Sequence, residues 1–165
     1  MSNLAFHQQP AERLIDVTLD PVSIVRSANP RVERERQIAI YDLLDENFFA
    51  LVDQHAGPYR LVLGNLNSRL VFHVHNESSQ PLASHALPLA PLKRIMRDYF
   101  NLCASYDDAI RSAPPSHLQM LDNGRRKLHD EGGRTLAERL AAKIKVDHNT
   151  GRRLFTLICS LQWRG

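Results

Sequence analysis

Three histidines on predicted strands have the residue type and spacing that could do chemistry. His73 and His75 lie two residues apart in a run that favours a strand, so their side chains point to the same face. Two imidazoles on one face can chelate a metal ion, and either His85 on a neighbouring predicted strand or Glu77 would have to complete the site. The alternative is that His73 and His75 are the solvent-facing positions of a strand whose other face is apolar.

A second candidate site is a group of basic residues in the C-terminal part of the chain. Residues 111–165 hold 11 Lys and Arg against 5 Asp and Glu, whereas residues 1–110 hold 10 against 13. This asymmetry predicts an anionic partner, either an acidic protein surface or a nucleic acid. A solvated helix face is the alternative, because Glu131, Glu138 and Asp147 interrupt the basic residues. The candidate contact residues are Arg125, Arg126, Lys127, Arg134, Arg139, Lys143 and Lys145.

The sequence contains no recognisable catalytic set. Ser84 lacks the strand-turn-helix glycine context of a nucleophile elbow, and neither Cys103 nor Cys159 has a basic neighbour that would make it a thiolate. The pair Gly132-Gly133 follows no predicted strand and precedes no Lys-Ser or Lys-Thr pair, so it predicts a helix stop and not a phosphate loop. We therefore expect no catalytic residue and no cofactor.

The elements that must position these residues change in character along the chain. Segments 14–19, 59–63, 69–75 and 82–87 favour strands, the second and third of them forming an antiparallel hairpin. Between the first two strands, Asn29 predicts the N-cap of a helix that begins at Pro30. Later apolar periodicity predicts four more helices, over 91–110, 116–131, 136–144 and about 150–161.

This order predicts an α+β fold, with a small antiparallel sheet of about four strands packed against a helical C-terminal half. We expect a flexible leader at residues 1–12 and a single domain over 13–165, whose apolar last helix is central. The chain has no signal-peptide pattern, no membrane-length apolar run, and only two cysteines. These features predict a cytoplasmic protein that does not enter a membrane.

The helices predicted between 135 and 163 permit a helix-turn-helix alternative. With Val146 at the apolar turn position, Ala141 and Leu154 fall where a small and an apolar residue belong. However, Lys145 falls where glycine normally makes the turn, and Gly151 falls where a branched apolar residue anchors the second helix. DNA recognition is thus the weaker hypothesis. Self-association through Trp163 and the apolar last helix is a further one.

Three segments carry a resemblance to a bacterial family, uncharacterised protein family 0262, from about Arg13 to the C-terminus. They are Gly57-Pro58-Tyr59-Arg60-Leu61, Asp98-Tyr99-Phe100, and the ending from Arg152-Arg153-Leu154-Phe155 to Trp163-Arg164-Gly165. The resemblance implies no activity, ligand or catalytic residue. Members often have acidic or basic residues in place of His73 and His75, which weakens the metal hypothesis.

The function these observations favour is that of a non-catalytic cytoplasmic binding or regulatory protein that uses its basic C-terminal helical surface. A small metal-dependent enzyme or metal-binding protein built around His73, His75 and His85 is the alternative, and a nucleic-acid-binding protein is another.

Overall fold

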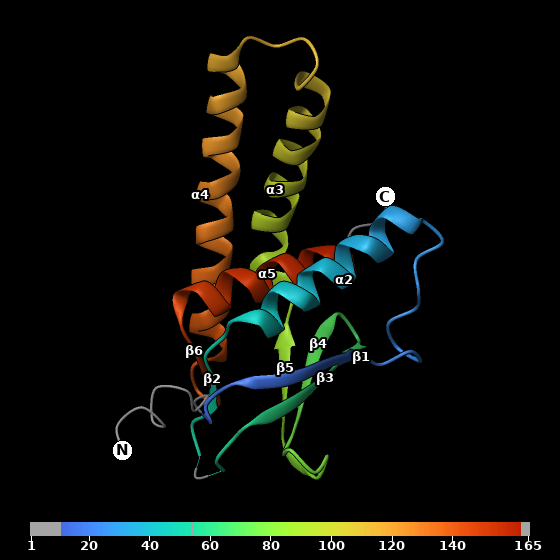
Figure 1. The fold of residues 1–165 in the computed structure, drawn as a ribbon, viewed down its shortest axis with the longest axis vertical. Helices are drawn as coiled ribbons and strands as arrows, with labels where there is room; N and C mark the ends of the chain where they lie inside the picture. Colours follow the sequence, from blue (N-terminus) through green and yellow to red (C-terminus); the bar gives the residue numbers. More distant parts are fainter. Residues whose placement is uncertain (1–10, 54, 163–165) are drawn as a thin grey trace, which may run out of the picture.

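A four-stranded sheet lies at one end of the molecule, and helices cross one of its faces (Figure 1). The computed structural model describes residues 11–53 and 55–162, so residues 1–10 of the predicted leader, like Trp163, lie outside the described residues. The fold is α+β, as predicted. In chain order its elements are β1 (Leu14–Leu19), α2 (Pro30–Asp45), β2 (Phe49–Leu51), β3 (Tyr59–Leu66), β4 (Arg69–His75), β5 (Pro81–Pro88), α3 (Ala90–Ala109), α4 (Pro115–Leu140), β6 (Ile144–Val146) and α5 (His148–Gln162).

The sheet has the order β1-β3-β4-β5 and is mixed, whereas the sequence predicts an antiparallel one. Strands β3, β4 and β5 pair antiparallel, but β1 pairs parallel with β3. The parallel pair arises because α2 lies between β1 and β3 in the chain and carries it back to the same end of the sheet. The inner face buries rows such as Val17, Leu61 and Val74.

The β3–β4 hairpin is confirmed, with a tighter turn than predicted. Strand β3 continues to Leu66, so Gly64 lies within a strand and not in the loop. Asn67 and Ser68 make the turn with φ angles of 52° and 63°. Two consecutive residues with positive φ match the twist of an antiparallel pair, which is why two-residue hairpin turns favour asparagine.

Helix α2 begins as predicted. The Oδ1 atom of Asn29 accepts a hydrogen bond from the backbone N–H of Arg31 at 2.9 Å, and Pro30 occupies the first turn. Past its end, Asn47 accepts from the backbone N–H of Leu14 at 2.7 Å and donates to the Leu14 carbonyl at 3.2 Å. This asparagine thereby joins the end of α2 to the start of β1.

Helix α4 is one continuous helix of 26 residues, where the sequence predicts two helices separated at Gly132-Gly133. The predicted helix stop is therefore wrong. Both glycines are buried where α4 crosses α5: a Cβ at Gly132 would overlap the ring of Phe155, and a Cβ at Gly133 would lie 2.8 Å from the backbone nitrogen of Arg152. The glycines permit the close approach of two helices.

The helix predicted over 136–144 is confirmed only to Leu140, as the last part of α4, and Ile144–Val146 form the three-residue strand β6 instead. Strand β6 pairs antiparallel with β2, with Lys145 opposite Ala50. Three residues are too few for a two-residue period to be recognised in the sequence. Strand β6 lies where the turn of a helix-turn-helix would be, and α5 buries Leu154, Phe155 and Ile158, so α4 and α5 do not form that motif.

Helix α5 is central, as its apolar composition predicts. It packs against both α2 and α4, and α3 runs beside α4 as the other half of a helical hairpin that stands away from the sheet (Figure 1). At its start, Asp147 Oδ1 accepts from the backbone N–H of Thr150 at 2.8 Å, and Thr150 Oγ1 accepts from that of Phe48 at 2.8 Å. These two bonds anchor α5 beside β2.

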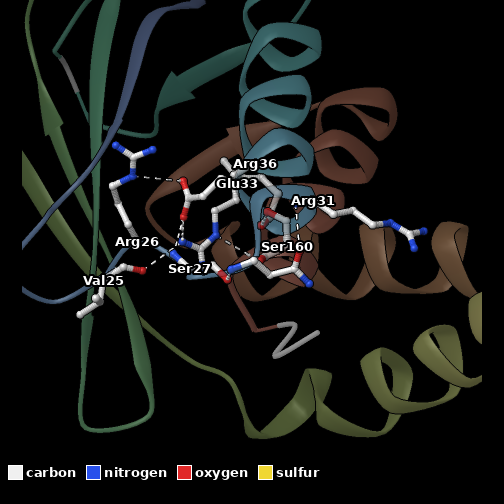
Figure 2. Close-up of polar contacts among 9 residues, drawn as sticks. Val25, Arg26, Ser27, Arg31, Glu33, Arg36 and Ser160 are labelled. Atoms are coloured by element: carbon white, nitrogen blue, oxygen red, sulfur yellow. Dashed lines mark hydrogen bonds and ion pairs between the residues drawn. The ribbon is translucent and has the colours of Figure 1, made fainter.

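A buried arginine holds the other end of α5 (Figure 2). Arg36, only 6% exposed, donates from Nε to the carbonyl of Ser160 at 3.2 Å and from Nη1 to the carbonyl of Val25 at 3.1 Å. Its Nη1 also lies 2.9 Å from Oε1 of Glu33, which accepts from the backbone N–H of Ser27 at 2.5 Å. One guanidinium thus joins α2, the loop before it and α5.

Candidate functional site

The structure does not bring the three candidate metal-binding histidines together. His73 lies opposite Ser84 across the β4–β5 pair, whereas His85 lies opposite the buried Phe72 and therefore on the other face of the sheet. His73 Nδ1 is 3.0 Å from the Ser84 hydroxyl oxygen. Among residues 11–53 and 55–162, no group of three or more His, Cys, Asp and Glu side chains could hold a metal ion.

Two of the seven candidate basic residues are already paired within the protein. Arg125 Nη2 lies 2.6 Å from Asp122 Oδ1, and its guanidinium carbon stands 3.9 Å from the centre of the Tyr106 ring. Arg126 Nη2 lies 3.0 Å from the other carboxylate oxygen of Asp122. Their charges are therefore partly neutralised, and Arg125 is directed into the helical hairpin.

The remaining five basic residues are all exposed, and we name this set the basic band. None of them makes an ion pair or a side-chain hydrogen bond with any residue the structure describes. The band consists of Lys127 and Arg134, seven residues apart on α4, and of a group at the end of that helix, Arg139, Lys143 and Lys145.

The acidic residues near the basic band are mostly engaged elsewhere. Glu131 pairs with Arg94 of α3 at 2.6 Å, and Asp147 caps α5. Asp130 Oδ1 lies 2.9 Å from Nε of Arg152. Glu138 alone of the three interrupting acids makes neither an ion pair nor a side-chain hydrogen bond among the described residues. The positive charge of the band is therefore largely uncompensated, which the linear sequence does not show.

His85 lies beside the basic residues at the end of α4, among them Arg139 and Lys143. Burial lowers the pKa of its imidazole, and the positive charge of Lys143 lowers it further. Its Nε2 atom is buried and has no hydrogen-bond partner among the described residues. Near neutral pH the ring is therefore uncharged, so it adds no positive charge to the basic band.

A second polar cluster joins α4 to α5 around His129. Its Nε2 lies 2.6 Å from Thr156 Oγ1, and its Nδ1 accepts a hydrogen bond from Nε of Arg152 at 3.3 Å. The imidazole ring stacks on Tyr99 of α3, with ring centroids 5.8 Å apart and planes at 26°. Residues of three helices thus meet at one histidine.

The His129–Thr156 pair resembles a base beside a nucleophile, but its protons are wrongly placed for that chemistry. Because Nδ1 of His129 accepts from Arg152, the proton of the neutral ring is on Nε2, which donates to Thr156 Oγ1. The Thr156 hydroxyl in turn donates to the Arg152 carbonyl at 3.2 Å. In this arrangement the imidazole donates to the hydroxyl and does not accept from it, and the hydrogen bonds of the cluster join α4 to α5.

The buried histidines predict a stability that falls on mild acidification. Burial lowers the pKa of His129, and the charge of Arg152 lowers it further; burial also lowers the pKa of His85. Below about pH 6.5, where histidine in an unfolded chain protonates, the unfolded state binds more protons than the folded one. We therefore expect the free energy of unfolding to decrease as pH falls through this range, by at most about 1.4 kcal/mol per pH unit for each group.

Urea denaturation of the wild type and of His129→Gln on both sides of that pH measures the effect. The amide of glutamine can still donate to Thr156 but cannot titrate, so the variant should show a smaller pH slope. His117→Gln, at an exposed position near the start of α4, is the control and should keep the wild-type slope. An unchanged slope in His129→Gln would exclude His129 as the source.

A cavity of about 320 Å³ lies between the helices, beside the His129 cluster. Burial raises the pKa of the Cys103 and Cys159 thiols and of the Tyr99 phenol, so all three are neutral at physiological pH. The cavity can hold a small molecule, but its thiols are poor nucleophiles. Its walls are formed by Arg31 and Glu35 of α2, Tyr99, Phe100, Cys103, Ala104 and Asp107 of α3, Arg125 of α4, and Thr156, Cys159 and Ser160 of α5.

Comparison with known protein families identifies the family of this chain. The family described as Uncharacterised protein family (UPF0262) matches residues 11–164. The chain belongs to UPF0262. A UPF0262 protein of Brucella anthropi is 54% identical over 157 residues, which cover 94% of this chain and 97% of the relative. A UPF0262 protein of Brucella canis is 55% identical with the same coverage, and one of Mesorhizobium japonicum is 53% identical over 158 residues, or 95% and 97% of the two chains.

No solved structure matches this UPF0262 chain. Within the part of the chain that the structure describes, no helix combines the length and the apolar character needed to cross a bilayer.

Two of the segments that carry the UPF0262 resemblance meet at the cavity. Segment 98–100 supplies Tyr99 and Phe100, and segment 152–159 supplies Thr156 and Cys159. Sequence reasoning identified only Arg125 of the cavity residues as a site residue, because the others are spread over three helices and look like ordinary core positions or ordinary helix-surface charges. Both segments carry the family resemblance, and this is the signal that could have pointed to the cavity. It could be used only with the arrangement of the helices, which brings the two segments together.

Proposed function

We propose that this UPF0262 protein is a cytoplasmic, non-catalytic binding protein that holds an acidic partner protein on the basic band. One observation carries the proposal: all five cations of the band are exposed, and no carboxylate among the described residues pairs with them. Unpaired charges of one sign attract a partner of opposite sign over a Debye length and orient its approach.

The alternative is that these cations form a solvated helix face. Its main support was that acidic residues such as Glu131 and Asp147 interrupt the basic ones. Both acids interrupt the basic residues in the sequence, yet one pairs with Arg94 and the other caps α5. Arg139 has a second role at the last turn of α4, where a cation is favoured by the negative end of the helix dipole. Lys143 and Lys145 lie beyond that turn, so the dipole does not account for them.

An acidic protein fits the basic band better than a nucleic acid does. Helix α5 buries most of its residues, and its partly exposed Arg152 and Arg153 lie beside Asp130 and Glu46, so it presents little free polar face to a DNA groove. The band is also divided, with Lys127 and Arg134 along α4 and the other three cations at its end. Such a discrete group suits a cluster of carboxylates better than the evenly spaced phosphates of a duplex.

Charge reversal of four band residues is expected to weaken binding to an acidic polypeptide. The variant is R134E/R139E/K143E/K145E, and the probe is a short fluorescent poly-glutamate peptide followed by fluorescence anisotropy at low salt. Each lost exposed ion pair is worth a few tenths of a kcal/mol to 1 kcal/mol, so four together should weaken binding by about tenfold or more. Added salt should weaken wild-type binding because exposed charges are screened.

The matched control reverses four exposed cations outside the band, R34E/R69E/K93E/R111E. Each set of four reversals takes the formal net charge from +3 to −5, so the two variants differ only in where the charge is changed. Equal weakening by both would show that net charge and not the band governs binding. A short DNA duplex that binds the wild type more tightly than poly-glutamate does would instead favour a nucleic-acid partner.

A further inference from the structure

We propose that the outer face of α2 binds a second copy of this chain, as an antiparallel pair of identical helices. Helix α2 packs on α5 at one side of the molecule, and no other described element crosses its outer side (Figure 1). This surface is separate from the basic band.

The outer face of α2 carries one straight row of four side chains. Successive residues of an α-helix are rotated by about 100°, so residues at steps of four, three and four lie on one side. The members of this α2 row are Arg34, Ile38, Tyr41 and Asp45. The opposite side of the helix is the buried one, formed by Val32, Arg36, Ala39 and Leu43. The row therefore points away from the core.

The centre of the α2 row is apolar and exposed. The exposed fractions are 48% for Ile38 and 71% for Tyr41, and the two side chains lie one turn apart. Single exposed apolar residues are ordinary, but these two form a continuous surface. Tyrosine is also among the residues that protein interfaces favour, because its ring is large and its hydroxyl tolerates water.

The two ends of the α2 row carry opposite charges. Arg34 and Asp45 are both exposed, and neither makes an ion pair or a side-chain hydrogen bond with the residues the structure describes. Arg152 and Arg153 share an open hollow with Asp45, but their own ion pairs are with other carboxylates. Each end of the row can therefore pair with a charge from outside the chain.

The α2 row is complementary to itself when two copies run antiparallel. A two-fold axis midway between residues 39 and 40 places Arg34 opposite Asp45 of the partner subunit, and Ile38 opposite Tyr41 of the partner subunit, because both pairs have the same midpoint. The apolar pairs are then central, with one ion pair at each end. A parallel arrangement would instead bring like charges together. The charges thus select a second copy in one orientation.

The contact is expected to be weak. Glu35 and Asp42 lie on one flank of the row, and the antiparallel pair brings each toward its like charge on the other copy. One helix face also buries less than the roughly 1,200 Å² of a standard interface, so we expect a transient dimer with a Kd of about 100 µM. Anisotropy and denaturation experiments use more dilute protein, so substitutions of Arg34 do not act on them through the dimer.

Sedimentation equilibrium of the full chain tests the proposal between about 10 µM and about 1 mM, a range that brackets the expected Kd. We expect the weight-average mass to rise from that of a monomer toward that of a dimer, with no larger species, because a two-fold contact between identical faces is closed. A mass that stays monomeric at the highest concentration, or that grows beyond a dimer, would overturn the proposal.

Charge reversals identify the contact. R34D and D45R each place like charges opposite one another at both ends of the row, so each should weaken dimerisation by about tenfold or more. An equimolar mixture of the two variants should dimerise again, because every charge of one then faces its opposite on the other. Lys93→Asp reverses an exposed cation on α3 and should dimerise as the wild type does. A mixture that stays monomeric would refute the pairing of Arg34 with Asp45.

Truncation of the apolar centre gives an independent test. Tyr41→Ala should weaken dimerisation by about tenfold or more, because a central aromatic side chain is lost from the contact. Met120→Ala removes another exposed apolar side chain, 61% exposed on α4 and outside the row, and should have no effect. Circular dichroism checks that each variant remains folded. Wild-type dimerisation of Tyr41→Ala would place the contact elsewhere.

Discussion

Replacing Gly133 with alanine is expected to lower the free energy of unfolding by about 2 kcal/mol, although alanine is the better helix former. A Cβ at this position would lie 2.8 Å from the backbone nitrogen of Arg152 and 2.9 Å from its Cα. Both are backbone atoms of α5, so the contact can be relieved only by moving the two helices apart. Gly151 lies at the same crossing, where its Cβ would be 2.8 Å from the Gly133 carbonyl oxygen.

Gly124→Ala, on the same helix, is the matched control. A Cβ there would meet Cδ1 of Leu102 at 3.0 Å, and this half-exposed side chain can rotate away. Alanine should therefore raise the free energy of unfolding by up to about 1 kcal/mol through helix propensity alone. Urea denaturation followed by circular dichroism gives both values. Similar stabilisation by the two substitutions would contradict a tight crossing of α4 and α5.

Replacing Arg36 with methionine is expected to destabilise the protein by about 3 kcal/mol, because it removes the buried donor of two carbonyls and the nearer of the two cations beside a mostly buried carboxylate, the other being Arg26 at 3.9 Å. The Glu33 side chain is only 17% exposed, and the carbonyl oxygens of Val25 and Ser160 both accept from the Arg36 guanidinium (Figure 2). Methionine keeps much of the packing volume, so the loss measures the polar network and not a cavity. Thermal and urea denaturation should agree on the direction.

Arg34→Met provides the comparison within α2. Arg34 is exposed and makes no ion pair with the described residues, so its replacement should change the free energy of unfolding by no more than about 0.5 kcal/mol. Arg36→Lys should recover only part of the loss, because an ammonium group cannot present the planar donors that reach Ser160, Val25 and Glu33 together. A stable Arg36→Met variant would show that the network contributes little.

The sequence predicted correctly those parts of the fold that depend on residues adjacent in the chain. The Asn29–Pro30 helix start and the hairpin turn at Asn67 each depend on a few adjacent residues. The glycine pair at 132–133 was misassigned because glycine serves both as a helix stop and as a site of close approach, and the choice depends on α5, which is distant in sequence. Strands β2 and β6 were missed because each has three residues and is defined by the other.

The candidate sites divide in the same way. Composition identified the basic residues, but only the structure shows that Arg125 and Arg126 share Asp122 and that Glu131 pairs with Arg94. The metal hypothesis started from His73 and His75, which share one face of the sheet. It also required the His85 side chain to point to that face, and this depends on the register between β4 and β5. The cavity could not be predicted, because four helices contribute to it and its residues are ordinary core types and ordinary helix-surface charges.

The most direct test of the central claim is affinity capture from a bacterial cytosolic extract at low salt, with and without nuclease treatment. Three baits are compared: the wild type, the band variant R134E/R139E/K143E/K145E, and the control R34E/R69E/K93E/R111E. The proposal predicts that the wild type and the control retain the same acidic protein and that the band variant does not. Retention of that protein by all three baits, or loss of all retained material on nuclease treatment, would contradict binding of an acidic protein by the basic band.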